Sequence, residues 1–439
     1  MSALEMAVEK MEFAALIGMD WADQKHTWSM RTADGKVHRG ELKHSPEAIQ
    51  VWVGELQQRF GERLVAIALE QSRGSLVAML SKYAHLVLFP IHSKTLKYYR
   101  EAFQPSGAKS DPRDADLALE VLHMHRDKLR CLQPDTEETR KLQFLTEQRR
   151  DLVNRQTSEK QILIAWLKQV FPQVLEWFGD VGCQSVRDLL LKWPTLQSLQ
   201  EVRPQSLRHF FSRHRCGNGE EIEERIAQIR AAVPATHDRA LLEAGVLVIQ
   251  SRLRLLSELH ASILEFDRGI EETYRKHPDR AIMESFPGAG PALEPRLIAA
   301  VGTQRDRFTS SDNLAMYVGI APVKEASGKQ KWVHWRWACP KFIRQTFHEW
   351  AGCSMRTCGW AREHYEAQRA KGKGHHAAIR SVAFKWIRIF FRCWRDRTLY
   401  CEETYLRTRQ ARQPQPQPAA QQLVWKSCAG FVKLAKISS

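Results

Sequence analysis

Three familiar features are missing from this chain of 439 residues: long apolar runs, paired-cysteine motifs and a Walker loop for nucleoside triphosphates. No run of about eighteen apolar residues occurs, so we expect no membrane span. The acidic N-terminal segment, residues 1–12, lacks the basic start and apolar stretch of a signal peptide. These absences favour a cytoplasmic protein.

The nine cysteines give no sign of a structural zinc site. Their number is odd and no CxxC motif occurs. Cys353 and Cys358 are five residues apart, with no second cysteine or histidine pair at zinc-like spacing. We therefore expect reduced, partly buried thiols in a reducing compartment.

Positive charge is abundant and unevenly distributed. The formal net charge is +16, and residues 321–400 contain 17 Lys and Arg against 5 Asp and Glu. This surplus favours a polyanionic partner, either nucleic acid or an anionic membrane surface. The length and a hydrophobic content of 43% suggest two or three domains with substantial cores.

Four carboxylates near the start are spaced as a divalent-metal site would require: Asp20, Glu70, Asp111 and Asp114. Asp20 and Glu70 each end an apolar run typical of a buried strand, and ligands bind at such strand ends in open α/β sheets. Asp111 and Asp114 are three apart at the start of an expected helix, so they share one face. Hard oxygen ligands suit Mg²⁺ or Mn²⁺, the metals of phosphoryl transfer. Any one acid alone is more often a helix cap or a loop residue, and Asp111-Pro112 is also a good helix start.

Residues 13–125 show the pattern of a mixed α/β domain. Three consecutive strands are followed by strands that alternate with helices, which is the order of a ribonuclease-H-like fold. The expected strands are 13–20, 25–32, 37–43, 64–69 and 86–91, and the expected helices are 46–59, 75–82 and 111–127.

Two long helices are expected at about 136–171 and 238–275. The first follows a heptad phase whose seam also contains Arg149, Gln156 and Glu159, so any coiled coil is imperfect. The pair is compatible with an antiparallel arm or a dimer contact, and equally with two amphipathic helices in one bundle. Between them, residues 172–236 form a proline-containing helical insert, in which 213–219 have the composition of an exposed basic loop.

The segment 285–300 has the form of a helix-hairpin-helix around Pro287-Gly-Ala-Gly290. Its glycines would let backbone N–H groups approach a phosphate at a helix N-terminus. From spacing alone, an ordinary Pro-Gly turn between helices is an equally good interpretation.

Ser327 lies in an Ala-Ser-Gly sequence between an apolar segment and a basic one. The nearby cations could hold a scissile phosphate; they are Lys324, Lys329, Lys331, His334 and Arg336. A serine hydroxyl needs activation to act as a nucleophile, and the sequence shows no dedicated base. By spacing alone, the simpler interpretation is that Ser-Gly marks a turn.

Aromatic and basic residues alternate in 331–350, which includes Lys341 and Arg344, and again in 384–397. Such interleaving suits base stacking combined with phosphate contacts. For 384–397, the helical spacing makes a core role for the aromatics the better interpretation, with the cations facing outward as a phosphate-binding surface.

These residues together resemble the DEDD transposases of bacterial insertion sequences, which are bridge-RNA-guided serine recombinases with a RuvC-like N-terminal domain. The resemblance rests on Gly18-Met-Asp20, on Leu69-Glu70, and above all on the segment 109–115, Lys-Ser-Asp-Pro-Arg-Asp-Ala. In the second half it rests on Pro287-Gly-Ala-Gly290, on 319–322, and on Ser327-Gly328. The turn after Glu70 departs from the family pattern by one extra residue.

The resemblance implies a DNA transposase or recombinase. Asp20, Glu70, Asp111 and Asp114 would bind Mg²⁺ or Mn²⁺, and Ser327 would form a phosphoserine link to DNA. The expected nucleic-acid contacts are Lys109, Lys324, Lys329, Lys331, His334, Arg336, Lys341 and Arg344. DNA, a structured guide RNA and a homodimer or homotetramer are the implied partners, with no membrane. Storing the phosphodiester energy in the serine link would account for the missing Walker loop.

The domains expected on this basis are a RuvC-like metal-binding domain at 1–130 and a helical or coiled-coil region at 131–278 with the insert at 172–236. A mainly α transposase domain with the helix-hairpin-helix-like motif follows at 279–405, and a flexible tail at 406–439. Two other functions fit the sequence. One is a metal-dependent junction nuclease that uses water as its nucleophile, and the other is a non-catalytic nucleic-acid-binding protein.

Overall fold

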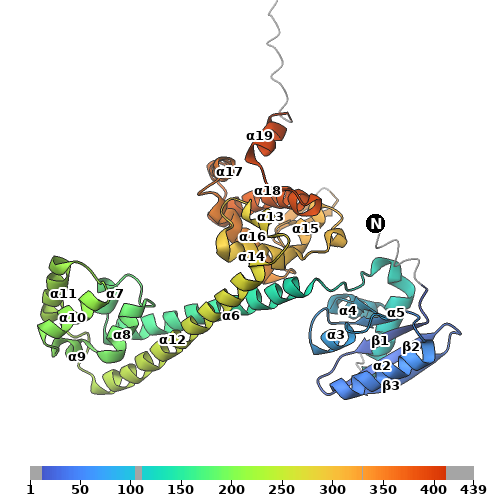
Figure 1. The fold of residues 1–439 in the computed structure, drawn as a ribbon, viewed down its shortest axis with the longest axis horizontal. Coiled ribbons are helices and arrows are strands. Elements are labelled where there is room, and N and C mark those ends of the chain that lie inside the picture. Colours follow the sequence, from blue (N-terminus) through green and yellow to red (C-terminus); the bar gives the residue numbers. More distant parts are fainter. Residues whose placement is uncertain (1–11, 104–110, 329, 412–439) are drawn as a thin grey trace, which may run out of the picture.

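The computed structural model describes residues 12–103, 111–328 and 330–411, which form three bodies (Figure 1). An α/β domain comes first, a two-helix arm with a small helical head comes next, and a mainly helical domain comes last. Among the described helices, none combines the length and the apolar character needed to cross a bilayer.

The N-terminal domain is built on a mixed five-stranded sheet in the order β3-β2-β1-β4-β5. Its strands are β1 (Ala15–Asp20), β2 (Lys25–Thr32), β3 (Val37–Lys43), β4 (Val65–Leu69) and β5 (Leu86–Pro90). The first three strands pair antiparallel, and β4 and β5 run parallel to β1. This confirms the mixed sheet expected from the sequence, and the strand order is consistent with a ribonuclease-H-like domain.

Helices cover both faces of this sheet. The apolar run of β4 is buried on both sides, with Val65, Ile67 and Leu69 packed toward α2 (Pro46–Phe60) and α3 (Ser75–Leu80). The alternate residues Ala66 and Ala68 pack toward α4 (Ser93–Phe103) and α5 (Asp111–His125). A short 3-10 turn, η1 (Arg126–Lys128), ends the domain.

Helix α5 lies unusually close to β1. A Cβ added at Gly18 would sit 2.2 Å from the carbonyl oxygen of Ala115 and 2.2 Å from the amide nitrogen of Leu119. Only glycine permits that approach, which brings the first turns of α5 onto the strand that ends at Asp20.

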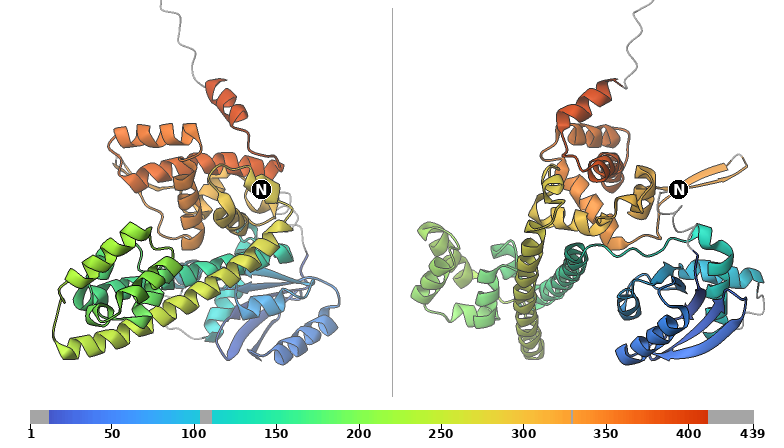
Figure 2. Two further views of the ribbon diagram at one scale, coloured as in Figure 1. Left: turned by 60° about the vertical axis from the view of Figure 1, so that its left-hand side comes forward. Right: turned by 45° about the vertical axis from the view of Figure 1, so that its right-hand side comes forward.

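The arm consists of α6 (Glu137–Val170) and α12 (Arg239–Arg275), which pack side by side (Figures 1 and 2). At a rise of about 1.5 Å per residue, each helix is roughly 50 Å long. Polar residues that interrupt the predicted seam pair across the two helices: Arg149 Nε lies 2.7 Å from Asp267 Oδ1, and Arg252 Nη1 lies 2.8 Å from Glu159 Oε2. The charged seam residues of α6 therefore have their ion-pair partners on α12 of the same chain.

The head corresponds to the predicted helical insert. It consists of five helices that surround a hydrophobic core. They are α7 (Gln173–Trp177), α8 (Gln184–Lys192), α9 (Leu196–Gln200), α10 (Pro204–Arg213) and α11 (Gly219–Ala231). Their apolar residues pack together with the distal ends of α6 and α12, so the head and the arm tip share one core.

The C-terminal domain surrounds an aromatic core to which the base of the arm contributes Leu142 and Ile270. Its elements are α13 (Arg280–Glu284), α14 (Gly290–Val301), η2 (Arg305–Arg307), α15 (Ser311–Tyr317), β6 (Val323–Ser327), β7 (Gln330–His334), α16 (Lys341–Ser354), α17 (Gly359–Ala370), α18 (His375–Asp396) and α19 (Glu402–Ala411). In α18, Trp386 and Trp394 are buried while Arg388 and Arg392 are exposed, so the core interpretation of 384–397 is confirmed.

Candidate active site and nucleic-acid interface

Asp20 and Glu70 leave the sheet at the same edge. Strands β1 and β4 are parallel neighbours with Met19 opposite Leu69, so one further step in register places Asp20 opposite Glu70. Adjacent strands lie about 4.8 Å apart, and paired residues point to the same face. Asp20 is half-buried and Glu70 is exposed.

Asp114 reaches the same region from α5. It is only 6% exposed and directly precedes Ala115, which touches Gly18. Its Oδ1 accepts a hydrogen bond from Arg100 Nη2 of α4, which compensates the burial of the charge. We call Asp20, Glu70 and Asp114 together the acid edge.

The acid edge has the right chemistry for a metal but does not form a complete ligand set. Among the side chains that the structure describes, no three His, Cys, Asp or Glu groups lie close enough to hold an ion. The side chain of Asp111 falls outside the described part. Carboxylate oxygens at one sheet edge fit a hard divalent cation, and Arg100 uses only one of the two oxygens of Asp114.

Several hydrogen bonds between described residues connect the N-terminal domain and the segment after it to the rest of the chain. Arg73, three residues after Glu70, donates from Nη1 to both carboxylate oxygens of Glu147 on α6, at 2.7 and 2.9 Å. Asp135, which follows the domain, accepts hydrogen bonds from the Thr303 amide at 2.8 Å and from Arg307 Nη2 at 2.8 Å. The loop that carries Glu70 is thus anchored at the base of the arm.

Ser327 occupies the tip of the β6–β7 hairpin, which projects from the C-terminal domain (Figure 2, right). It pairs in register with Gln330, and Gly328 makes the turn with φ +57°. Ser327 is exposed. Within the described residues, no contact joins its hydroxyl to the acid edge of the same protomer.

Lys324 and His334 flank Ser327 on the hairpin. Lys324 is exposed on β6. His334 Nε2 lies 2.8 Å from Glu325 Oε1, and this hydrogen bond raises the pKa of His334. Lys109 and Lys329 lie outside the described residues, and so does the side chain of Lys331.

The base of the hairpin carries a pair of arginines stacked on one indole. The guanidinium carbons of Arg344 and Arg380 lie 4.8 and 4.3 Å from the ring centroid of Trp335. Burial, and then the charge of Arg344, lower the pKa of Arg380. Arg336 anchors the segment by donating from Nε to the Ala321 carbonyl at 3.2 Å.

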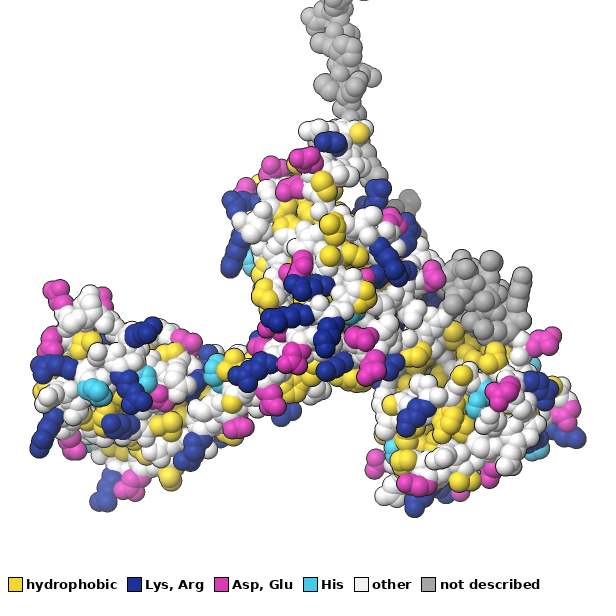
Figure 3. Space-filling model, in the orientation of Figure 1, with side chains coloured by type: hydrophobic (Ala, Val, Ile, Leu, Met, Phe, Trp, Pro, Cys, Tyr) yellow, Lys and Arg dark blue, Asp and Glu magenta, His cyan; other side chains and the backbone are white. Residues whose placement is uncertain are grey.

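Exposed aromatic and basic residues continue around this stack. Trp332 and Trp337 are 49% and 78% exposed, and Lys341 is exposed at the start of α16. Figure 3 shows Lys and Arg side chains over the C-terminal domain and the base of the arm, interspersed with acids. Aromatic faces beside cations are suited to bases and phosphates.

The Pro-Gly-Ala-Gly turn serves packing. A Cβ on Gly288, whose φ is +75°, would lie 2.6 Å from the backbone of Ser354 on α16. Trp350 Nε1 donates to the Pro287 carbonyl at 3.1 Å. The turn therefore joins α13 and α14 to the aromatic core, while its predicted phosphate contact stays a prediction.

Comparison with known proteins identifies the family. Residues 17–172 match a transposase family model, the DEDD transposase of the IS110 group. Residues 280–366 match the model described as the transposase IS116/IS110/IS902 family. The chain belongs to the IS110/IS116 transposase family. The two matched segments contain the acid edge and the hairpin, and leave the head between them unmatched.

Several members of this family are similar over nearly their whole length. The mini-circle putative transposase for IS117 of Streptomyces coelicolor is 27% identical over 88% of this chain and 95% of its own length. The insertion element IS110 43.6 kDa protein of the same organism is 24% identical over 89% and 96%. The insertion element IS900 42 kDa protein of Mycobacterium paratuberculosis is 25% identical over 77% and 84%.

Sequence reasoning missed three residues that lie close to the predicted site residues. Arg100 and Arg380 contact their partners only through tertiary packing, so no local pattern marks them. Asp116 did have a signal, because it extends the acidic motif by one helix position. It accepts from Ser29 Oγ at 2.5 Å and from Arg39 Nε at 2.9 Å, which joins α5 to β2 and β3.

Proposed function

We propose that this transposase cuts and rejoins DNA through a phosphoserine intermediate at Ser327, aided by a divalent cation held at the acid edge. The observation that carries the proposal is the exposed position of Ser327 on a projecting turn with cations behind it. A nucleophile that attacks a bulky duplex must be presented in this way. The parallel register that places Asp20 opposite Glu70 supports the metal half of the site.

The chemistry conserves phosphodiester bonds. The Ser327 Oγ loses its proton and forms a bond to phosphorus, while the bond from phosphorus to one sugar oxygen breaks and that oxygen gains a proton. Rejoining reverses the step with a different sugar hydroxyl as the nucleophile. Bound Mg²⁺ or Mn²⁺ would supply charge stabilisation at the phosphate, with Asp20, Glu70, Asp111 and Asp114 as its ligands. Lys324 and Arg336 would hold the phosphate and orient it.

Assembly into a homodimer or homotetramer is part of the proposal. The serine and the acid edge of one protomer share no described contact, so the proposal requires either a domain movement or acids from a second copy. A homodimer or homotetramer would supply them and would prevent cutting before assembly. A structured guide RNA, implied by the resemblance, would select the DNA by base pairing while the protein holds shape and backbone.

The test is to trap the covalent product. The full chain is incubated with the DNA ends of its element, the flanking RNA and Mg²⁺, and residue 327 is examined for phosphoserine by mass spectrometry. Ser327→Ala should abolish both the adduct and strand joining while leaving DNA binding unchanged. An adduct that persists in Ser327→Ala would refute the proposed nucleophile.

A metal-dependent nuclease that uses water is the second candidate, and the separation of Ser327 from the acid edge favours it. It predicts cleavage without an adduct, retained by Ser327→Ala and lost in Asp114→Ala. A non-catalytic binding protein predicts neither cleavage nor joining, and DNA binding that tolerates both substitutions. The three functions therefore give three distinct patterns in one set of assays.

A further inference from the structure

The head contains a basic hollow that the proposed chemistry does not use. It measures about 650 Å³ and is formed by α8, by α10 and by Arg203, which directly precedes α10. Its charged and titratable lining residues are Asp188, Lys192, Arg203, His209, Arg213 and His214. Figure 3 shows His side chains beside Lys and Arg side chains on the head.

The three full cations of this hollow have no acidic partner. Lys192, Arg203 and Arg213 are exposed, and none forms an ion pair with a described carboxylate; Lys192 Nζ lies 4.5 Å from the ring centroid of Trp193. The single acid, Asp188, is already engaged: Gln184 Nε2 donates to its Oδ1 at 2.8 Å, and His214 Nε2 lies 3.7 Å from its Oδ2. Uncompensated cations in a concavity attract an anion.

The backbone of α10 adds to this attraction. Residues 205, 209 and 213 are spaced by four and so share the face that lines the hollow. The helix begins at Pro204, and no side chain caps its N-terminus. The partial positive charge of that terminus therefore faces the same region as Arg203.

The basic character is local and does not follow from the composition of the head. Residues 172–236 contain eight Lys and Arg and eight Asp and Glu. Four of the acids lie on α11, whose sequence begins Gly-Glu-Glu-Ile-Glu-Glu. Glu223, one of these acids, pairs with Arg208 of α10, and none of the four lines the hollow.

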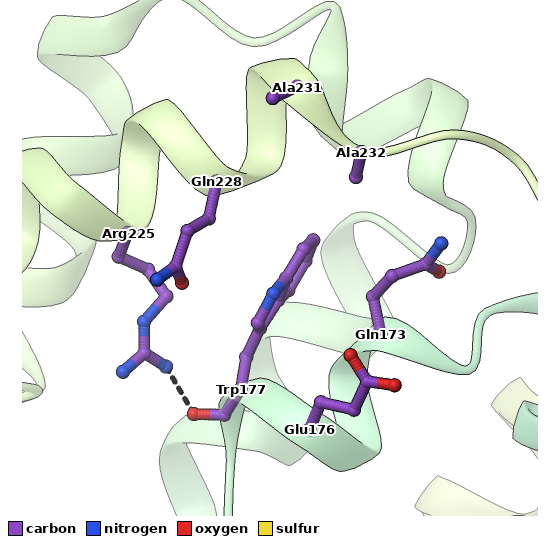
Figure 4. Close-up of a pocket in the computed structure, with 7 residues that line it drawn as sticks. All are labelled: Gln173, Glu176, Trp177, Arg225, Gln228, Ala231 and Ala232. Carbon is purple, nitrogen blue, oxygen red and sulfur yellow. Dashed lines mark hydrogen bonds between the residues drawn. The ribbon is translucent and has the colours of Figure 1, made fainter.

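A second hollow in the head lacks these properties (Figure 4). It measures about 660 Å³ and is lined by Trp177, Glu176 and Arg225 among others. Arg225, the only cation among the described lining residues, already donates a hydrogen bond to the Trp177 carbonyl. The carboxylate of Glu176 would repel a phosphate, and Arg225 is already hydrogen-bonded within the protein. This hollow is therefore poorly suited to bind phosphate.

We propose that the hollow of α8 and α10 binds the phosphodiester backbone of a nucleic acid; the proposal rests on the proposed function for the presence of such a partner. Lys192 ends α8, while Arg203 and Arg213 lie at opposite ends of α10, and cations spread in this way suit a polymer with repeated charges better than a single small anion. The arm holds this contact away from the C-terminal domain (Figure 1). The head is then a distant anchor that sets how far the bound nucleic acid extends.

The test compares two variants of the full chain. The triple variant Lys192→Gln, Arg203→Gln, Arg213→Gln removes the cations of the hollow. Arg208→Gln is the matched control, since Arg208 lies on the same helix, does not line the hollow and pairs with Glu223. The probes are a DNA duplex of about forty base pairs and a structured RNA of similar length, titrated over a range of salt concentrations.

Wild type should bind at least one probe, and the triple variant should bind that probe on the order of 10-fold more weakly, with the salt slope reduced by about 2 to 3. Arg208→Gln should change the dissociation constant by less than about 2-fold, because it removes no phosphate contact. The probe that loses affinity shows whether the anchor takes DNA or RNA.

A lysine footprint covers the case in which the triple variant does not fold. In wild type, saturating probe should protect Lys192 from acetylation. Full acetylation, or an unchanged salt slope in a folded triple variant, overturns this inference while leaving the phosphoserine proposal intact. Tighter binding to phosphatidylglycerol vesicles than to both probes also overturns it. Failure of wild type to bind any nucleic acid overturns the proposed function itself.

Discussion

The N-terminal and C-terminal domains present their predicted site residues in opposite ways. The acid edge lies at the ends of buried strands, with Asp114 held by Arg100 and the close approach of α5 enforced at Gly18. Ser327 lies at the tip of an exposed two-stranded hairpin, with few contacts to position it. Strand ends hold groups precisely, whereas a lone hairpin in water is only marginally stable.

This difference suggests a division of labour. Under the proposed function, the acids would be held in place before substrate arrives, and the hairpin would reach its final position when nucleic acid or a second protomer contacts it. Four predictions test this comparison, beginning with the acids themselves.

Glu70→Gln should have the largest effect. It replaces a proposed metal ligand by a neutral amide, so strand joining should fall by at least about 100-fold while DNA affinity stays unchanged. The rate is measured as phosphoserine adduct formed per unit time. Glu55→Gln, an exposed position on α2 of the same domain, should keep the full rate. Equal rates for the two variants would contradict a role for Glu70 in catalysis.

Gly288→Ala should be the most damaging scaffold change in the C-terminal domain. Its φ of +75° disfavours a side chain, and the backbone of Ser354 lies 2.6 Å from the added Cβ. We expect a loss of about 3 kcal/mol in the free energy of local unfolding, from overpacking plus backbone strain. Hydrogen exchange of the α16 amides measures it.

Gly290→Ala is the matched control for that change. Its φ of +57° is also left-handed, but no atom lies within 4 Å of the added Cβ. The free energy of local unfolding should fall by only about 1 kcal/mol, because this substitution adds backbone strain but no steric clash. If Gly288→Ala lowers the free energy of local unfolding no more than Gly290→Ala does, the turn is not packed on α16 in solution.

Local sequence patterns predicted the strands of the N-terminal domain and the two arm helices, but not α4 or most helices of the C-terminal domain. The apolar run of β4, the 3.6-residue periods of α6 and α12, and the order of strands all follow from local spacing. The Arg100–Asp114 pair and the arginines stacked on Trp335 come from tertiary packing, which one sequence does not reveal. Arg149 and Glu159 mark the limit of prediction from one sequence. Their heptad positions identify them as polar seam residues, but their partners on α12 are known only from the structure.

The acid edge should also respond to pH through His26. His26 Nε2 lies 2.8 Å from His44 Nδ1, the Ala22 amide donates to His26 Nδ1 at 3.2 Å, and His44 Nε2 lies 2.9 Å from Ser75 Oγ. This relay connects the loop after Asp20 to the helix that follows Glu70. Burial, and then the neighbouring His44, lower the pKa of His26 from 6.5 to about 4.

The folded state therefore keeps His26 neutral where the unfolded chain would bind a proton. Its contribution to stability is complete above pH 6.5 and is lost as the pH falls toward 4. Between pH 7 and pH 5 the N-terminal domain should lose about 2 kcal/mol, measured by hydrogen exchange of the β1 amides. His26→Asn should flatten this dependence, whereas Ser75→Ala, which leaves the titrating group in place, should not. A steep dependence in His26→Asn would assign the effect to another group.

The smallest expected effect lies in the arm that joins the two domains. Arg252 and Glu159 are 31% and 20% exposed, and they pair between α12 and α6. A double-mutant cycle with Arg252→Gln and Glu159→Gln should give a coupling energy of about 1 kcal/mol from the unfolding of the arm. Arg155 and Asp151, an exposed pair within α6, should give only about 0.3 kcal/mol. Equal coupling in the two cycles would mean that the helices separate in solution, and the head would then no longer be held at a fixed distance from the hairpin.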